Sequence, residues 1–203
     1  MMMRFAAGGK SDPPEASVER RIRDGLGDRS IVLVGMPGCG KSAIGRRLAP
    51  RLNLPFVDAD DEIERAAGKT IREIFEDHGE PYFRAGEVRV IARLLNAGPQ
   101  VVATGGGSFM SEDTRNNIRN SGISIWVKAE LPVLVRRVSK RSTRPLFEGR
   151  DATTVMRELM EIRYPVFAAA DIIVESRDVP HEVMVEEIIK VLSAYPFPAQ
   201  PAV

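Results

Sequence analysis

The sequence predicts a single α/β domain in which a five-stranded parallel sheet lies between two layers of helices. Short apolar runs, typical of strands buried on both faces, alternate along the chain with longer segments of helical periodicity. The chain has 203 residues, which is enough for one domain with a hydrophobic core and short for two. Together these observations favour a three-layer α/β/α sandwich.

Five short apolar runs are the expected strands of the sheet. The first, Ile-Val-Leu-Val at 31–34, ends in a glycine, which suits a buried strand followed by a turn. The others are 55–57, 100–104, 123–127 and 171–174. We expect these strands to pair in parallel, because helical segments lie between them and a parallel pair needs such a crossover connection.

The segments between the strands have the apolar spacing of helices. Ile44, Leu48 and Leu52 share one face of a helix expected over 42–52. The first 17 residues are rich in Gly, Pro and small side chains and are expected to be disordered, before a short helix over 18–26. Further helices are expected from the second strand to about residue 96, and over 132–140, 152–167 and 181–194.

Composition excludes several classes of protein. The net charge of +1 gives no sign of a nucleic-acid or membrane-surface binder. No run reaches the roughly 18 apolar residues of a spanning helix, and the N-terminus lacks the apolar core of a signal peptide. Cys39 is the single cysteine, so an internal disulfide and a cysteine-based metal site are both excluded. We expect a cytoplasmic protein.

The stretch Gly-Met-Pro-Gly-Cys-Gly-Lys-Ser at 35–42 has the pattern of a phosphate-binding loop, or P-loop. It follows an expected strand and opens an expected helix, which is the context that this motif requires. Backbone N–H groups and the helix N-terminus can surround phosphate oxygens, while Lys41 reaches the outer phosphates and the Ser42 hydroxyl binds Mg²⁺. The alternative is a glycine turn that only leads into a helix.

The rest of the chain narrows the class of P-loop protein. The Asn-Lys-x-Asp motif with which GTPases read guanine is absent. The strand at 100–104 runs into three glycines rather than into the Mg²⁺-binding aspartate of many ATPases. The carboxylate that supports a metal must therefore come from elsewhere in the sequence.

Two aspartates follow the second expected strand, at the edge of the sheet where the P-loop also lies. Asp58 and Asp60 could divide the work of a phosphotransferase, one supporting the metal and the other aligning an acceptor hydroxyl and taking its proton. The alternative is structural, because acids are favoured at helix starts and Asp61 with Glu64 has the spacing of a capping box.

A glycine triplet at 105–107 ends the third expected strand at the same edge. Residues without a Cβ let the backbone approach a small ligand closely, although a flexible turn is an equal alternative for the triplet alone. Most arginines of this chain are expected on the surface. If Arg84, Arg144 and Arg163 converge, their target is a small anion held by bidentate contacts.

Taken together, these motifs resemble those of the shikimate kinases, P-loop enzymes that phosphorylate the 3-hydroxyl of shikimate on the route to chorismate and the aromatic amino acids. The resemblance implies the P-loop kinase fold and Mg²⁺ATP as co-substrate. The matching stretches occur in family order over about 30–175 and read GMPGCGKS, FVDAD, FRAGE, TGGG, RPLF and RYPVF.

The resemblance also implies where ATP and the metal bind. Ser42 and Asp58 would serve Mg²⁺, Asp58 through water. Arg137 would lie near the adenine, and Arg144 would come from a mobile lid over about 139–151 and meet both phosphates and substrate. The positions implied for ATP are Gly38, Cys39, Gly40, Lys41, Ser42, Ala43, Arg137 and Arg144.

For the acceptor, the resemblance implies that Asp60 contacts the reacting hydroxyl, as a base or as a positioning residue. Arg84 and Arg163 would grip the shikimate carboxylate. The backbone of Gly105, Gly106 and Gly107 would close on the ring, and Lys41, Asp60 and Arg144 would be the catalytic set. The implied layout is an extension over 1–29, a kinase domain over 30–195 and a tail over 196–203, in a monomer that binds neither nucleic acid nor membrane.

Two departures from the family pattern and two rival functions remain. Pro165-Val166-Phe167 stands where the family often has Pro-Leu-Tyr, and Gly86 replaces a bulkier residue, but neither removes a catalytic group. A gluconate kinase-like enzyme also acts on an anionic polyol, and non-catalytic shikimate-kinase-like modules exist. Cys39 could present a reactive thiol to the nucleotide or be a small, inert residue turned inward.

Overall fold

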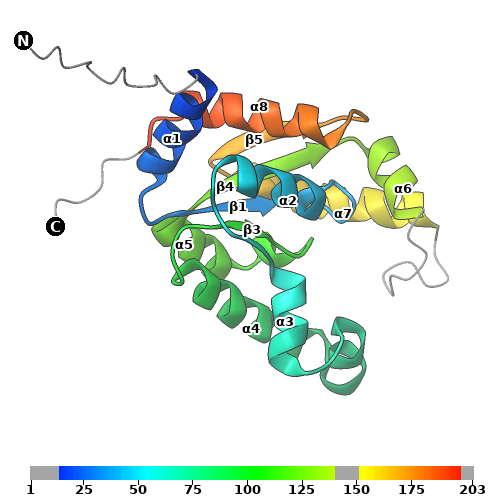
Figure 1. Ribbon diagram of the computed structural model, residues 1–203. Helices are drawn as coiled ribbons and strands as arrows, with labels where there is room; N and C mark the ends of the chain where they lie inside the picture. Colours follow the sequence, from blue (N-terminus) through cyan, green and yellow to red (C-terminus); the bar gives the residue numbers. More distant parts are fainter. Residues whose placement is uncertain (1–13, 140–150, 198–203) are drawn as a thin grey trace, which may run out of the picture.

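The structure is a computed structural model that describes residues 14–139 and 151–197. Its centre is a sheet of five parallel strands in the order β2-β3-β1-β4-β5 (Figure 1). This confirms the predicted five-stranded parallel sheet, with boundaries shifted by one or two residues. The strands are β1 Ser30–Val34, β2 Phe56–Asp58, β3 Val101–Ala103, β4 Gly122–Ala129 and β5 Ile172–Ser176.

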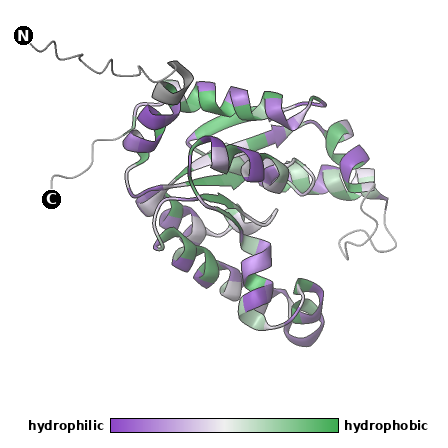
Figure 2. Ribbon diagram, in the orientation of Figure 1, coloured by the Kyte–Doolittle hydropathy of each residue, from purple (hydrophilic) through white to green (hydrophobic). Residues whose placement is uncertain are grey.

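Helices cover both faces of the sheet, as a parallel sheet requires. On one face, α8 packs against α1 and α2; on the other, α4 packs against α5, and a short 3₁₀ turn, η1, contacts α4, α5 and α7. Figure 2 shows the hydrophobic residues concentrated on the strands and on the helix faces that cover them. The helices that cover the two faces are α1 Pro14–Leu26, α2 Lys41–Arg51, α4 Ile71–Leu95, η1 Ser108–Met110, α5 Glu112–Ser121, α7 Ala152–Phe167 and α8 His181–Ala194.

Two further helices lie near the carboxyl edge of the sheet. Helix α3 (Ala59–Ala67) packs against α4 beyond that edge, and α6 (Leu131–Ser139) packs against α7. Helix α4 is kinked at Gly79, whose φ of +78° lies in the region that favours glycine. The kink separates a short first segment from the longer segment that returns along the sheet.

One prediction about secondary structure was wrong, and one helix had been given no range. Helix α1 begins at Pro14, so residues 14–17 are helical rather than disordered, and a proline is favoured in the first turn of a helix. Ile22 and Leu26 of this helix are fully buried against the core, although the sequence assigned them to an extension. Helix α5 was not predicted, because it is polar and buries only Thr114 and Ile118.

None of the helices within residues 14–139 and 151–197 combines the length and the hydropathy that a bilayer span needs.

Candidate active site

The P-loop connects the carboxyl end of β1 to the first turn of α2. Gly35, Gly38 and Gly40 have φ values of +140°, +83° and +107°, so side chains would be strained at these three positions. The Lys41 side chain is buried and curls back over the loop, where Nζ donates to the carbonyl oxygens of Gly35 at 2.9 Å and Met36 at 3.0 Å. The loop is therefore held in shape by its own lysine.

Cys39 lies inside this loop with its side chain turned away from solvent. Its exposed fraction is 0%, and its sulfur lies 3.8 Å from Lys41 Nζ. The interpretation of Cys39 as a thiol facing the nucleotide is therefore wrong, and the alternative in which its sulfur is turned inward describes the structure. Its carbonyl oxygen does contribute to the site, because it accepts bonds from Ser176 Oγ at 3.0 Å and Arg137 at 3.2 Å.

A hollow of about 290 Å³ opens above the loop. It draws its walls from five parts of the chain that meet at the carboxyl edge of the sheet: the P-loop with the start of α2, the first turn of α3, the end of β3, and the facing ends of α6 and α8. Its lining residues are Pro37, Gly38, Gly40, Lys41, Ser42, Ala43, Asp60, Thr104, Gly106, Arg137 and His181.

Asp58 and Asp60 have different settings at the end of β2. Asp58 is the N-cap of α3, and its carboxylate accepts from the backbone N–H of Asp60 at 3.1 Å. This cap replaces the capping box that Asp61 and Glu64 could have formed. Asp60 lies in the first turn of α3 and lines the hollow. The structural and the functional interpretations are therefore compatible, because the cap fixes the backbone from which Asp60 projects.

The glycine triplet after β3 is required by space rather than by backbone conformation, because none of its three residues has a positive φ. A Cβ on Gly106 would lie 2.6 Å from the ring of Pro37 in the P-loop, and one on Gly107 would lie 3.0 Å from the Arg84 guanidinium. A Cβ on Gly105 would lie 2.7 Å from Glu87 Oε1 and 3.0 Å from Asp60 Oδ1. The triplet thus lets two halves of a site approach each other.

Arg84 is fixed on α4 by a buried acid that the sequence analysis did not identify. Its guanidinium donates to Glu87 Oε2 at 2.7 Å, and Glu87, only 2% exposed, accepts at its other oxygen from Ser108 Oγ at 2.5 Å. Burial opposes the charge of Arg84, but Glu87 and Glu80 together raise its pKa above the usual value. The signal for Glu87 was its i,i+3 spacing from Arg84.

Arg163 approaches the same point from α7. It donates to the carbonyl oxygen of Gly106 at 2.9 Å, and among the described residues it has no acidic hydrogen-bond partner. Burial lowers the pKa of the Arg163 guanidinium, and repulsion from Arg84 lowers it further. Arg84 is paired with Glu80 and Glu87, whereas Arg163 has no acidic hydrogen-bond partner among the described residues, so Arg163 is the cation that an anionic ligand could engage.

Tyr164, the next residue of α7, anchors the helix that carries Arg163. Its hydroxyl donates to the carbonyl oxygen of Ala129 at the end of β4. Burial raises the Tyr164 pKa to about 12, so the hydroxyl stays protonated and remains a donor across the neutral range.

The other expected site residues divide into those that the structure places at the hollow and one that it does not describe. Arg137 donates to Ser176 Oγ at 3.0 Å and to the carbonyl oxygen of Arg177 at 2.8 Å, which ties α6 to the end of β5. His181 lines the same hollow and was not predicted. Burial and the nearby Arg47 and Arg137 lower its pKa, so it is neutral at pH 7. Arg144 lies outside the described residues.

The Ser108 hydroxyl should stabilise the fold through Glu87. Replacing Ser108 by alanine removes one donor from a buried carboxylate, so we expect the free energy of unfolding to fall by about 1–3 kcal/mol. Urea denaturation measures the change. Ser193→Ala is the matched control, because the Ser193 hydroxyl donates to the Lys190 carbonyl on the exposed side of α8. Equal stability of the two variants would contradict the proposal that the buried Glu87 carboxylate depends on the Ser108 hydroxyl.

Comparison with known proteins gives this geometry a family. A sequence model of the shikimate kinase family matches residues 37–193. A shikimate kinase of Bradyrhizobium diazoefficiens is 57% identical over 183 residues, which are 90% of this chain and 88% of that protein. A solved shikimate kinase of Acinetobacter baumannii in complex with shikimate superposes with a TM-score of 0.80 at 30% identity, over 89% of this chain and 98% of that chain.

The gluconate kinase alternative receives less support. A gluconokinase of Sinorhizobium meliloti superposes with a TM-score of 0.53 at 20% identity, over 82% of this chain and 93% of that chain, which shows the shared fold alone. The family match covers most of the described residues and includes both halves of the hollow and the arginine pair beside it. The chain belongs to the shikimate kinase family.

Proposed function

We propose that the hollow above the P-loop holds ATP, and that Asp60, Arg84, Arg163 and the glycine triplet hold shikimate beside it. The activity itself, transfer of the ATP γ-phosphate to the 3-hydroxyl of shikimate, follows from the family to which the chain belongs. The observation that carries the assignment of residues is the position of Gly106. A Cβ on Gly106 would clash with Pro37 of the P-loop, and the Gly106 carbonyl accepts from Arg163. The proposed sites for the phosphate donor and the phosphate acceptor therefore meet at this residue.

On the ATP side, backbone N–H groups from Gly38 to Ala43 surround the phosphates at the start of α2, where the helix N-terminus favours negative charge. Lys41 leaves its carbonyl partners and turns to the outer phosphates. Arg137 lines the hollow and is held against the P-loop by its bond to the Cys39 carbonyl, and we assign it a place beside the nucleobase. Phosphoryl transfer needs in-line alignment and charge neutralisation more than covalent help, and this arrangement supplies both.

Magnesium fits the oxygen donors at the site. Mg²⁺ is usually held by one or two protein oxygens together with waters and phosphates rather than by a dedicated cage. The Ser42 hydroxyl lines the hollow, whereas Asp58 ends β2, which β3 separates from the strand that leads into the P-loop, and has one oxygen engaged in its helix cap. We assign Ser42 as a direct ligand and Asp58 as a ligand through water. When bound, the ion neutralises charge between the β- and γ-phosphates.

On the acceptor side, Arg84 and Arg163 bind the carboxylate of shikimate. Both are partly buried, so an anion between them relieves their mutual repulsion in surroundings poor in water. Asp60 lines the hollow from the first turn of α3, and we assign it to orient the 3-hydroxyl and accept its proton. The hydrogen-bonded pair of Glu87 and Ser108 keeps the Arg84 guanidinium in place for this contact.

The domain layout also remains a proposal. We assign 30–195 to the kinase domain, which the family match over 37–193 supports. The burial of Ile22 and Leu26 shows that the segment before residue 30 contributes to the same core. The assignments made for Arg144 and for the segment around it lie outside the described residues.

Shikimate should be the acceptor that stimulates ATP consumption. A coupled assay for ADP, run with shikimate, quinate, gluconate and nucleoside monophosphates, tests this directly. We expect strong turnover with shikimate and none with gluconate, because the chain belongs to the shikimate kinase family. Turnover of gluconate without turnover of shikimate would overturn the assignment.

Asp60→Asn keeps the shape of the side chain and removes its charge. We expect kcat to fall about 10²-fold or more, the usual scale for loss of a general base or of the group that orients the hydroxyl. Binding of Mg²⁺ATP should stay nearly normal, because Ser42 and Asp58 are unchanged. Asp61→Asn is the matched control, since Asp61 is exposed and does not line the hollow. Its carboxylate pairs with Arg46 at 3.5 Å. Equal turnover of both variants would assign the proton transfer elsewhere.

Arg163→Ala should separate the two substrates. We expect the dissociation constant for shikimate to rise about tenfold or more, because a charge-assisted contact to the carboxylate is lost. Binding of ATP in the absence of shikimate should change little. Isothermal calorimetry with each ligand measures both effects, with the exposed Arg119→Ala of α5 as the control for charge. Equal damage to both ligands would indicate that Arg163 acts only through the fold.

A further inference from the structure

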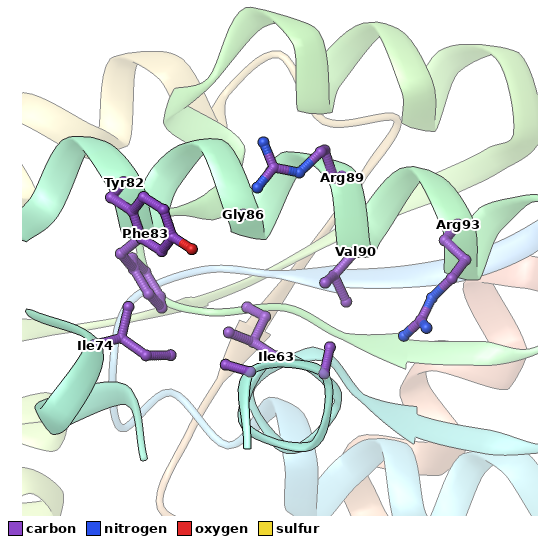
Figure 3. Close-up of a pocket in the computed structure, with 10 residues that line it drawn as sticks. Ile63, Ile74, Tyr82, Phe83, Gly86, Arg89, Val90 and Arg93 are labelled. Carbon is purple, nitrogen blue, oxygen red and sulfur yellow. The ribbon is translucent and has the colours of Figure 1, made fainter. Parts of the chain in front are cut away.

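A second hollow, separate from the one above the P-loop, lies between α3 and α4 (Figure 3). Its volume is about 270 Å³, close to the lower limit of about 300 Å³ for small-molecule sites. It shares no lining residue with the ATP hollow. Its lining residues are Ile63, Ala66, Ala67, Ile74, Tyr82, Phe83, Gly86, Arg89, Val90 and Arg93.

Small residues on the two facing helices create this space. A Cβ on Gly86 would meet nothing closer than a terminal nitrogen of Arg89 at 4.0 Å. Ala66 and Ala67 face it from α3 with single methyl groups. A glycine inside a helix weakens it, and no positive φ explains this one. The hollow is therefore present in the folded protein without any movement of its walls.

The floor of the hollow is apolar, and Figure 3 shows Ile63, Ile74, Phe83 and Val90 pointing into the space between the helices. The ring of Tyr82 stands at the edge, 55% exposed. Among the lining side chains, only the Tyr82 hydroxyl and two guanidinium groups carry hydrogen-bonding atoms. A polyol would lose its hydrogen bonds to water here without gaining new partners. An aromatic ring has no such hydrogen bonds to lose.

The charges at the edge favour one anionic group. Arg93 donates to Glu62 at 3.0 Å, and Glu62 also pairs with Arg65, so that carboxylate is already shared by two cations. Arg89, by contrast, makes no hydrogen bond or ion pair with any residue in the described part of the chain. It lines the hollow and reaches back along α4 toward Gly86 (Figure 3).

We propose that this hollow binds a small aromatic carboxylate, with its ring on the apolar floor and its carboxylate on Arg89. The volume admits one ring and a short side chain, and none of the lining residues belongs to the phosphate-binding loop. The guanidinium supplies a planar pair of donors that matches a carboxylate. This binding does not depend on the reaction proposed for the other site.

One aromatic ring separates the two sites. Phe83 lines the hollow, and the Arg84 guanidinium carbon lies 4.9 Å from the centroid of the same ring on the side of the glycine triplet. The Phe83 ring is further held by Phe75, with 4.6 Å between ring centroids. A ligand in the hollow therefore contacts the side chain on which Arg84 rests, without entering the active site.

The proposal can be tested with 3-phenylpropanoate and the ¹⁵N-labelled full chain in an NMR titration. We expect saturable shifts at the amides of residues 66–67 and 86–90, with a dissociation constant on the order of 1 mM, the scale for a ligand of this size. The uncharged 3-phenylpropan-1-ol should bind about tenfold more weakly, because it lacks the carboxylate.

Two pairs of variants separate the contribution of the cavity from that of the fold. Gly86→Leu fills the hollow, whereas Gly86→Ala makes the same improvement in helix propensity and leaves most of the space open. We expect binding to weaken about tenfold or more in the first and to change by less than about twofold in the second. Arg89→Gln should weaken binding about tenfold, while the exposed Arg119→Gln in α5 should have no effect.

Each contrary result overturns the proposal. Absence of saturable shifts at up to about 10 mM, well above the expected dissociation constant, would show that the hollow is not a site for this class of ligand. Undiminished binding in Gly86→Leu would locate the ligand elsewhere. Shifts concentrated at residues 105–107 would place the probe in the acceptor site instead. Equal affinity for the acid and the alcohol would show that Arg89 does not bind the carboxylate.

Discussion

The close approach of two backbone segments determines the arrangement of the whole site. The P-loop follows β1 and the glycine triplet follows β3, and these strands are neighbours in the sheet. Thr104 locks them together, because its N–H donates to the Leu33 carbonyl at 3.1 Å and its hydroxyl donates to the same oxygen at 3.0 Å. Two residues later, Gly106 meets Pro37, where any side chain would force the segments apart. The sheet, rather than side-chain packing, thus sets the spacing of these two segments, and with it the distance between the proposed nucleotide and acceptor sites.

The acceptor side depends on a chain of charges built around this contact. Glu87 is nearly inaccessible to water, which would be costly for an isolated carboxylate, and it is stabilised by Arg84 and Ser108 together. Arg163 has no acid of its own among its described hydrogen-bond partners and lies close enough to Arg84 to be repelled. Glu80 also accepts from Arg84 at 3.1 Å, so two acids and two arginines share this part of the site, and both acids are hydrogen-bonded to Arg84. In the proposed acceptor site, a carboxylate ligand supplies the acid that Arg163 lacks.

The sequence was sufficient where local chemistry determines the structure. The P-loop has three glycines at positive φ, and its pattern could be recognised because few residues tolerate those angles. The strands were predictable because a strand buried on both faces must be almost wholly apolar. The triplet at 105–107 was identified as a place of close approach, although the atoms that it approaches come from parts of the chain that no local pattern connects.

Long-range contacts explain the rest. Helix α5 is polar along most of its length and carries no apolar stripe, although Ser111 caps it by accepting from the Thr114 amide at 3.3 Å. Helix α1 looked like an extension, because its place in the core depends on α8, which lies at the other end of the chain. The direction of the Cys39 side chain and the partners of Glu87 are likewise tertiary facts. The family motifs filled this gap, because a motif shared with a family implies where its residues lie in the fold even when no local pattern predicts it.

The lysine of the P-loop has a consequence for the exchange of the proposed nucleotide. Its ammonium group already satisfies two carbonyl oxygens of the loop, so a nucleotide that attracted it would replace bonds rather than add them. The affinity for a triphosphate would then report a difference between two well-filled sets of partners. A diphosphate that did not reach the ammonium would let it return to those carbonyls, and the product would leave without a buried cation losing its partners. The contacts that hold the loop in shape would in this way favour release of the product.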